Sequence, residues 1–167
     1  GAGSWGIALS VLLHNNGHQI TVWSILEDEI NMLKTEHEHK DKLPGVKLAE
    51  DMEFTTSLQE AIAGKDILVL AVPSPYTRST SHNMKQYVAD GQIIVNVAKG
   101  IEEHTLMTLS QIIEEEIPQA NVAVLSGPSH AEEVGRGIPT TIVVGARTKE
   151  TAEYIQNLLN ESKVDKY

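Results

Sequence analysis

Short apolar runs recur along this chain, separated by stretches in which apolar residues return at helical spacing. Several runs are continuously apolar instead of alternating with polar residues, which is typical of parallel strands buried on both faces of a sheet. Gly or Pro stands beside many of them and marks the turns. The runs predict strands at residues 19–23, 53–56, 67–72, 93–97, 122–125 and 140–144.

The stretches between these runs predict helices. After Thr105, for example, Leu106 and Leu109 begin a series of apolar residues at the three- and four-residue steps of one helix face. Because helices and strands alternate almost throughout, we expect a doubly wound α/β fold with a mostly parallel sheet. No low-complexity linker or internal repeat interrupts the pattern, so residues 1–167 are expected to form one domain. The predicted helices cover residues 27–39, 57–63, 76–88, 105–116 and 150–159.

The chain opens with a glycine pattern, in which Gly1, Gly3 and Gly6 are spaced as G-x-G-x-x-G. The apolar segment 7–13 follows at once and predicts a buried helix, which Gly17 can end in the left-handed conformation. In a βαβ unit the first glycine permits a tight turn, the second lets the backbone approach a pyrophosphate, and the third lets the helix pack on the sheet. Free N–H groups at the helix start then bind the phosphates. The pattern therefore predicts a dinucleotide-binding loop.

A glycine loop of this kind normally follows a strand at the centre of the sheet. Since the sequence starts at Gly1, we expect this first strand to be missing from the chain. The strands on either side of it would then expose unpaired edges, which favours poor solubility or domain swapping.

The ends of three predicted strands carry small or polar residues, at 73–74, 98–100 and 126–129. In open α/β sheets, ligands bind beyond the carboxyl ends of the strands, so these residues should share one rim. Lys99 is the most informative, because a lysine directly after a buried strand lies beside a bound cofactor. Its ammonium is suited to neutralise a substrate phosphate or polarise a carbonyl. The alternative is a surface lysine in a loop.

The composition excludes several classes of protein. Thirteen Lys and Arg against twenty-three Asp and Glu give a formal charge of -10, which on average repels nucleic acid and anionic membranes. The absence of Cys excludes disulfides and thiolate metal sites. Neither a signal peptide nor an apolar run of membrane-spanning length is visible. We therefore expect a cytoplasmic protein that binds neither nucleic acid nor membrane.

The run from Lys34 to Lys42 contains two histidines, His37 and His39, on either side of Glu38. Residues two apart do not share a helix face, and mixed charges are typical of a solvated surface. We therefore expect a solvated face here and no metal site.

Together these residues resemble the bacterial NAD(P)-dependent glycerol-3-phosphate dehydrogenases. The order and spacing of the motifs agree across nearly the whole chain, and the last two motifs are more specific than the glycine loop. They are Gly1-Ala2-Gly3-Ser4-Trp5-Gly6, Val72-Pro73-Ser74, Val97-Ala98-Lys99-Gly100-Ile101-Glu102 and Leu125-Ser126-Gly127-Pro128-Ser129-His130-Ala131-Glu132-Glu133-Val134.

The resemblance implies an N-terminal Rossmann domain followed by a helical domain of similar size, in a cytoplasmic homodimer. It also implies the reversible interconversion of dihydroxyacetone phosphate and sn-glycerol 3-phosphate, which supplies the backbone of phospholipids. Matching positions imply that Lys99 touches both cofactor and substrate, and that Gly127 and Ser129 help hold the substrate. Tyr76 stands either near the dinucleotide or as a packed surface residue. The cofactor contacts implied are Gly1, Gly3, Ser4, Trp5, Gly6, Lys99 and Ala131.

Two groups that the resemblance requires do not occur in this sequence. The family's general base is a lysine in a Gly-Gly-Ala-Leu-Lys-Asn type motif, and its substrate-phosphate groups are an Arg-Asn pair. Both belong to the helical domain, which we expect to be absent from this chain. On this basis no residue of the chain is the catalytic base, and the chain by itself is expected to be inactive.

The choice between NAD and NADP depends on the end of the second strand of such a fold, where an acidic residue favours NAD and a basic one NADP. Here Trp23 is followed by residues 24–26, which are neither acidic nor basic. Glu27 and Asp28 favour the dipole of the next helix. The side chains of Lys40 and Lys42 are long enough to reach a 2′-phosphate, and we expect both cofactors to be accepted with weak preference.

Other functions remain open at this point. One is a different two-domain dehydrogenase of the same superfamily, such as a 6-phosphogluconate or ketopantoate type reductase. Another is a non-catalytic dinucleotide-binding module. A serine hydrolase is excluded, because Ser126 to His130 lacks the G-x-S-x-G turn and adjacent residues do not form a triad.

Overall fold

The computed structural model describes residues 1–126, 130–138 and 141–160. In this part of the chain, six strands alternate with seven α-helices, of which all but α6 were predicted from the sequence. The strands are β1 (Thr21–Trp23), β2 (Glu53–Thr55), β3 (Ile67–Leu70), β4 (Ile93–Asn96), β5 (Asn121–Ser126) and β6 (Val143–Ala146). The helices are α1 (Ser4–Asn15), α2 (Glu27–Glu36), α3 (Leu58–Ile62), α4 (Thr77–Met84), α5 (Leu109–Glu116), α6 (Ala131–Gly135) and α7 (Lys149–Asn160).

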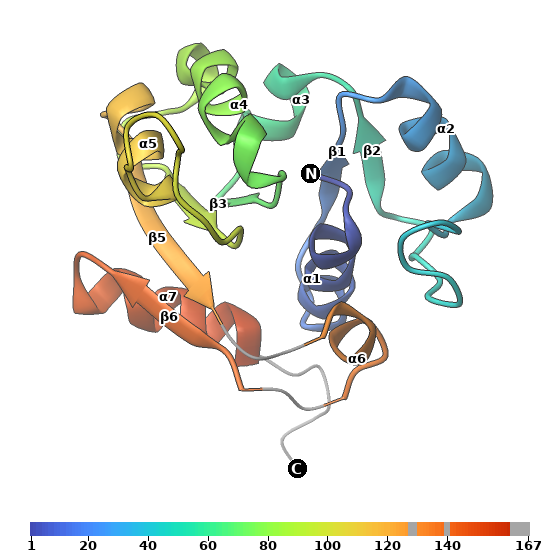
Figure 1. Ribbon diagram of the computed structural model, residues 1–167. Helices are drawn as coiled ribbons and strands as arrows, with labels where there is room; N and C mark the ends of the chain where they lie inside the picture. Colours follow the sequence, from blue (N-terminus) through green and yellow to red (C-terminus); the bar gives the residue numbers. More distant parts are fainter. Residues whose placement is uncertain (127–129, 139–140, 161–167) are drawn as a thin grey trace.

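The strands form two sheets instead of the single sheet that the alternation predicts. β1 and β2 pair in parallel, and β3, β4 and β5 form a parallel sheet to which β6 adds an antiparallel edge. Figure 1 shows the two sheets on either side of α1. The doubly wound, mostly parallel α/β architecture is therefore confirmed, but the strands are divided between β1 and β3.

A slot separates the two sheets at this division. Within the described residues, β1 pairs only with β2 and β3 only with β4, so their facing edges have no strand neighbour. Residues of β1, β3, α1, α3 and α4 line a cavity of about 140 Å³ between them. The expected unpaired edges are thus present. Burial alternates along β3: Leu68 and Leu70 are buried, whereas the other two residues of the strand are half-buried.

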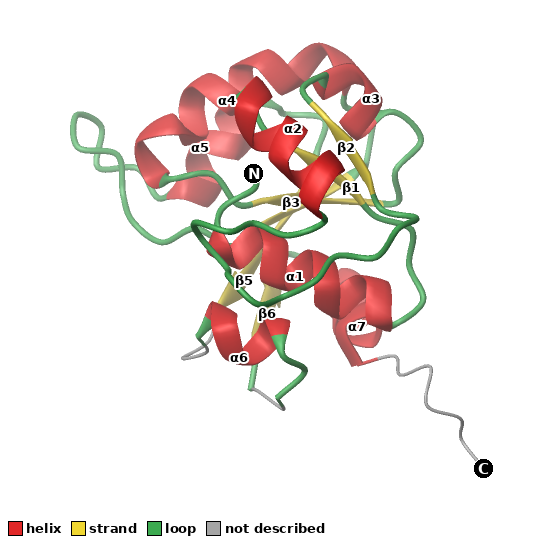
Figure 2. Cartoon of the chain, turned by 90° about the vertical axis from the view of Figure 1, so that its right-hand side faces the viewer, coloured by secondary structure: helices red, strands yellow, loops and turns green. Residues whose placement is uncertain are grey.

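Helices cover both faces of the larger sheet. Leu9 of α1 and Ile155 of α7 pack on one face, and Met84 of α4 and Ile113 of α5 pack on the other. Figure 2 shows α1, α6 and α7 on one side and α3, α4 and α5 on the opposite side. A further cluster joins α1, α2 and α6 to β1 and β2. These layers place the start of α1 and the carboxyl ends of β1 and β3 beside one another.

Two predicted boundaries are wrong for local reasons. The helix predicted from Thr105 begins only at Leu109, because Thr108 and Gln111 form a capping box at that point. Leu106 is 70% exposed with a positive φ of 59°, in a turn and not on a helix face. The last strand, β6, overlaps the predicted range 140–144 at Val143 and Val144 and ends two residues later, at Ala146.

The first helix ends as expected. Gly17 has a φ of 100°, and the amides of Gly17 and His18 donate to the carbonyls of His14 and Leu13. These two bonds satisfy carbonyls at the end of α1 that have no partner within the helix.

Candidate functional site

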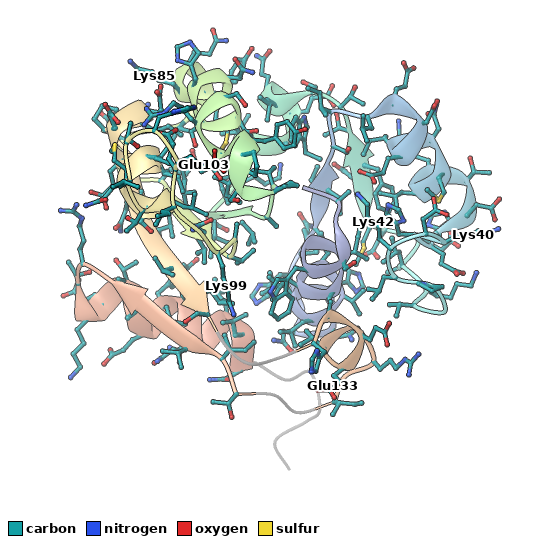
Figure 3. The ribbon with its side chains drawn as sticks, viewed as in Figure 1. Lys40, Lys42, Lys85, Lys99, Glu103 and Glu133 are labelled. Atoms are coloured by element: carbon teal, nitrogen blue, oxygen red, sulfur yellow. The ribbon has the colours of Figure 1, made fainter. Side chains whose placement is uncertain are left out.

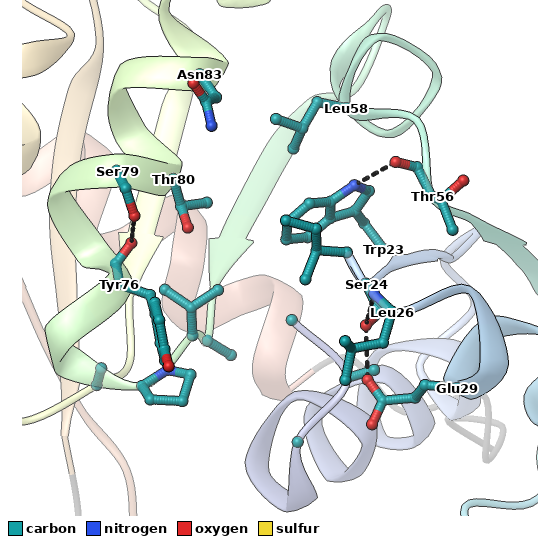
Figure 4. Close-up of a pocket in the computed structure, with 18 of the residues that line it drawn as sticks. Trp23, Ser24, Leu26, Glu29, Thr56, Leu58, Tyr76, Ser79, Thr80 and Asn83 are labelled. Carbon is teal, nitrogen blue, oxygen red and sulfur yellow. Dashed lines mark hydrogen bonds between the residues drawn. The ribbon is translucent and has the colours of Figure 1, made fainter.

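A cavity of about 1320 Å³ lies where the glycine loop meets the carboxyl ends of β1 and β3. Figure 4 shows that α4 forms one wall and that the end of β1 with the start of α2 forms the other. Ligand sites in open α/β sheets lie at this edge. The loop from Gly1 to Trp5 and the segment from Ala71 to Pro73 complete the lining.

The three glycines of the loop have different surroundings. A Cβ on Gly1 would lie 2.6 Å from the carbonyl oxygen of Ala71, and a Cβ on Gly6 would lie 2.2 Å from that of Gly1. Both distances are shorter than any real contact, so these two positions require glycine for backbone packing. A Cβ on Gly3, by contrast, would meet nothing within 4 Å. Gly3 therefore leaves open space at the cavity, where a ligand can approach the backbone.

Gly3 is also the N-cap residue of α1, and no side chain caps this helix end. The first N–H groups of a helix have no intrahelical acceptor and carry a partial positive charge. Since the cavity is lined by Gly3, Ser4 and Trp5, these donors lie at its wall. This arrangement suits an anionic ligand such as a pyrophosphate.

Ser4 and Trp5 differ in what their side chains do. The Ser4 hydroxyl donates to the carbonyl oxygen of Lys42 at 2.8 Å, which ties the glycine loop to the loop after α2. Trp5 packs against the apolar clusters around α1 and also faces the cavity. The expected contact residues Gly1, Gly3, Ser4 and Trp5 thus lie together at the cavity, and Gly6 packs behind them.

A buried carboxylate lies at the end of β1. The Glu29 side chain is 9% exposed and accepts hydrogen bonds from Ser24 at 2.7 Å, His39 at 2.8 Å and Lys42 at 3.1 Å. Burial by itself raises the pKa of Glu29, but the hydrogen bonds from His39, Ser24 and Lys42 outweigh it, and the pKa lies below its ordinary value of 4.5. Glu29 and Lys42 both line the cavity, and the Lys42 side chain is 46% exposed.

The histidine-rich run is a mostly exposed face, as its mixed charges predict, with His39 as the exception. His39 is 2% exposed and bonds Glu29, so its ring is part of the interior. Glu38 pairs with Lys47 at 2.8 Å. Lys40 pairs with Glu36 at 3.0 Å and does not line the cavity, whereas Lys42 does. In residues 1–126, 130–138 and 141–160, no three His, Asp or Glu side chains are grouped so as to hold a metal ion.

The walls of the cavity differ in character. Trp23 donates from its indole nitrogen to the Thr56 carbonyl at 2.9 Å, and it stands on the wall opposite Tyr76. On the α4 side, Tyr76, Thr80 and Asn83 line the space (Figure 4). Tyr76 is exposed and lies at the cavity, which suits the first of the two roles expected of it.

Lys99 is exposed at the edge of this site. Val97 and Ala98 line the cavity, but Lys99 itself does not. Its ammonium makes no hydrogen bond or ion pair with any residue that the structure describes. In Figure 3 the side chain points toward the end of the molecule at which α6 lies.

The remaining expected contacts are not placed at the cavity. Ala131 begins α6 and packs against the cluster around α1, outside the cavity lining. Gly127 and Ser129, expected to hold the substrate, lie outside the described residues.

Sequence reasoning missed Glu29 and His39. The signal for Glu29 was present, because Glu29 is four residues before Leu33 and so shares the buried face of α2. Nothing in the sequence placed His39 beneath Glu29, since the contact depends on how the loop after α2 folds back.

The glycine loop, the start of α1 and the cavity at the strand ends define a dinucleotide-binding α/β domain of the Rossmann type. Over residues 1–152 the chain matches the family described as NAD-dependent glycerol-3-phosphate dehydrogenase N-terminus, and it belongs to this family.

Individual relatives agree with this assignment. A glycerol-3-phosphate dehydrogenase (NAD(P)+) of Agathobacter rectalis is 64% identical over 162 residues, which are 96% of this chain and 48% of the relative. A protein of the same name from Fusobacterium nucleatum is 58% identical over 160 residues, 95% of this chain and 48% of the relative. The chain therefore spans about half the length of these relatives.

A solved structure shows the same fold. The crystal structure of glycerol-3-phosphate dehydrogenase from Coxiella burnetii superimposes with a TM-score of 0.90 at 26% identity, covering 96% of this chain and 49% of that one. None of the helices in the described part of this chain combines the length and apolar character that a membrane span needs.

Proposed function

We propose that this chain is the cofactor-binding half of an NAD(P)-dependent glycerol-3-phosphate dehydrogenase, with the helical catalytic half outside it. The observation that carries this is the open face of Gly3 at the uncapped start of α1, beside a cavity of about 1320 Å³. The name of the 64% identical relative supports the choice of reaction. The reaction interconverts dihydroxyacetone phosphate and sn-glycerol 3-phosphate in the cytoplasm, in a homodimer.

The described residues suit the binding of a dinucleotide along the strand ends. The N–H groups at the start of α1 would donate to the pyrophosphate, and Lys42, which also lines the cavity, would reach the 2′-phosphate of NADP. When bound, the nicotinamide supplies the hydride that is exchanged with C2 of the substrate. Trp5 and the segment from Ala71 to Pro73 contribute apolar lining to the cavity.

In this proposal Lys99 provides charge, and the proton is moved by a lysine of the other half. Lys99 is exposed and its ammonium has no partner among the described residues, which suits a role facing a phosphate or a developing oxyanion. Gly127 and Ser129 are proposed to help hold the substrate beside it, and Ala131 to lie near the cofactor.

The first experiment measures cofactor binding by the chain itself. The two tryptophans of the chain, Trp5 and Trp23, both line the cavity, so NADH or NADPH should change their fluorescence.

The second experiment measures turnover. The chain replaces the matching half of the Agathobacter rectalis relative, giving a hybrid enzyme. We expect the folded hybrid to reduce dihydroxyacetone phosphate. Cofactor binding without turnover would contradict the proposed reaction and support a non-catalytic module, and turnover of 6-phosphogluconate or ketopantoate instead would support a related dehydrogenase.

Replacing Lys99 tests its role in the hybrid enzyme. Lys99→Ala should lower kcat/KM for dihydroxyacetone phosphate by about a hundredfold, because one preorganised charge is lost from the transition state. The melting temperature should stay unchanged, since Lys99 is exposed and makes no bond to a described residue. Unchanged kinetics would remove Lys99 from the site.

The cofactor preference is tested by titrating the chain with each dinucleotide. Lys42 is suited to attract a 2′-phosphate, but its ammonium is already partly neutralised by Glu29 at 3.1 Å. We therefore expect the dissociation constants of NADH and NADPH to differ by less than about tenfold, or about 1.4 kcal/mol. A difference of about a hundredfold or more would contradict weak preference.

A further inference from the structure

The position of the Lys99 ammonium depends on the backbone that carries it. Within the part of the chain that the structure describes, the side chain makes no hydrogen bond or ion pair, so the described contacts act on the backbone that carries it. Lys99 stands in the loop between β4 and α5, and the two ends of this loop are held in different ways.

The end before Lys99 is held by Asn96, the last residue of β4. Asn96 is 3% exposed, and its amide donates to the Ala98 carbonyl at 3.2 Å while its oxygen accepts from the Ala98 N–H at 3.2 Å. This pair of bonds fixes the peptide that leads into Lys99.

The end after Lys99 is held by an ion pair. Arg78 donates from Nε to Glu102 Oε2 at 2.7 Å and from Nη2 to Glu102 Oε1 at 2.9 Å, which is a bidentate contact. Thr105 donates to Glu102 Oε1 at 2.6 Å, and the Glu102 N–H donates to the Met107 carbonyl at 2.9 Å. Glu102 thus joins the whole turn 101–108 to α4.

Arg78 is itself anchored on a second element. Its Nη1 donates to Glu116 at 2.9 Å and its Nη2 to Glu115 at 3.1 Å, both at the end of α5. Arg78 lies on α4 between Tyr76 and Ser79, which line the cavity. The hydrogen bonds from Arg78 and then Thr105 lower the pKa of Glu102 to about 2, so the pair is charged at any ordinary assay pH.

A close approach adds to this connection. Gly100 has a φ of 133°, and a Cβ there would lie 3.3 Å from the Cβ of Ser74. The residue after Lys99 therefore packs against the segment that leads into α4. The segment that leads into α4 and α4 itself therefore meet the Lys99 loop at Gly100 with Ser74 and at Glu102 with Arg78, and Arg78 Nη2 also lies 3.6 Å from the Met107 sulfur.

We propose that Arg78 is a positioning residue. Through its bidentate contact with Glu102, it holds the backbone of Lys99 in place beside the proposed cofactor cavity. The proposal rests on the proposed function, since Lys99 must act on the substrate for its position to matter. It assigns to Arg78 a role in turnover as well as in joining α4 to α5. Displacement of a charged group by about 1 Å is enough to lower a rate by up to about a hundredfold.

The test compares substitutions of two carboxylates, Glu102 and Glu115, that contact the same arginine in the hybrid enzyme. Glu102→Gln removes the charge that holds the Lys99 loop, and Glu115→Gln removes a charge that holds only α5. We expect Glu102→Gln to lower kcat/KM for dihydroxyacetone phosphate by roughly tenfold, with Glu115→Gln changing it by less than about twofold. Both variants should bind NADH as the unsubstituted chain does. Equal kinetic effects of the two variants would overturn the proposal.

A double-mutant cycle separates positioning from stability. If Arg78 acts through Lys99, Arg78→Met should lower kcat/KM in the hybrid but cause no further loss in the Lys99→Ala background. Arg147→Met, which removes the ion pair with Glu114 elsewhere on α5, serves as the control and should leave the kinetics unchanged. Equal losses with and without Lys99 would show a structural role only. Failure of the unsubstituted hybrid to turn over would instead count against the proposed function.

Discussion

At the scale of single residues, the glycine loop shows how one sequence pattern serves two physical needs. Gly1 and Gly6 are required because backbone atoms lie within 3 Å of where a Cβ would be, at 2.6 Å and 2.2 Å. Gly3 has no such neighbour and an ordinary φ of -71°. The fold around Gly3 therefore leaves room for a side chain, and the proposed function uses this room for a ligand.

The two kinds of glycine should respond differently to the same substitution. Gly6→Ala should lower the free energy of unfolding by about 1–3 kcal/mol, because the methyl group forces the Gly1 backbone to move. Gly3→Ala should cost no more than about 1 kcal/mol at this helix cap. It should nevertheless weaken NADH binding by at least about tenfold, since the methyl group enters the space of the pyrophosphate. Urea unfolding and fluorescence titration of both variants measure this, and normal NADH affinity in Gly3→Ala would contradict it.

At the scale of elements, local hydrogen bonds override hydrophobic spacing. The apolar series from Leu106 predicts an early start for α5, but Thr108 accepts from the Gln111 N–H and Gln111 accepts from the Thr108 N–H. This capping box begins the helix at Leu109 and leaves residues 101–108 as the turn that Glu102 and Arg78 hold. The boundary of α5 therefore determines which residues are available to fix Lys99.

Removal of the cap should be measurable. Thr108→Ala should lower the free energy of unfolding by about 1 kcal/mol, because one N–H at the start of α5 loses its acceptor. Thr35→Ala, on the exposed face of α2, is the matched control and should be neutral or slightly stabilising. Urea unfolding of the two variants compares them, and equal stabilities would show that the capping box contributes nothing.

At the scale of the whole molecule, the division between β1 and β3 is the main feature. Their facing edges have no strand neighbour in the described part of the chain, and a slot of about 140 Å³ lies between them. The cavity at the glycine loop adjoins this division, since Gly1 and Trp23 line both spaces. Within the described residues, the two sheets are thus joined by side-chain packing, through α1 and through Trp23 and α3, and not by strand pairing.

Unpaired edges favour association between chains. We expect the chain to form dimers or larger species as its concentration is raised, measured by analytical ultracentrifugation. The hybrid, in which the relative supplies the residues before the glycine loop, is the comparison and should show no species beyond its own dimer. A chain that remains a monomer over the full concentration range would contradict this expectation.

Much of the architecture could be predicted from the sequence because it depends on local signals. Apolar runs such as 93–97 are buried wherever they pack, Gly17 ends its helix through its own backbone, and the spacing of Gly1, Gly3 and Gly6 is fixed by the turn they form. These signals determined the order of strands and helices and the place of the dinucleotide loop.

Contacts between residues distant in sequence were decided only by the tertiary structure. Glu29 meets His39 because the loop after α2 folds back, and Arg78 meets Glu102 because α4 packs beside the turn after β4. From the sequence alone, a charged side chain is expected at the surface. Its burial and its partners depend on which distant segments of the chain pack beside it. The sequence thus determined the elements and their cofactor loop, and the fold decided which charges lie beside Lys42 and which contacts hold the Lys99 loop.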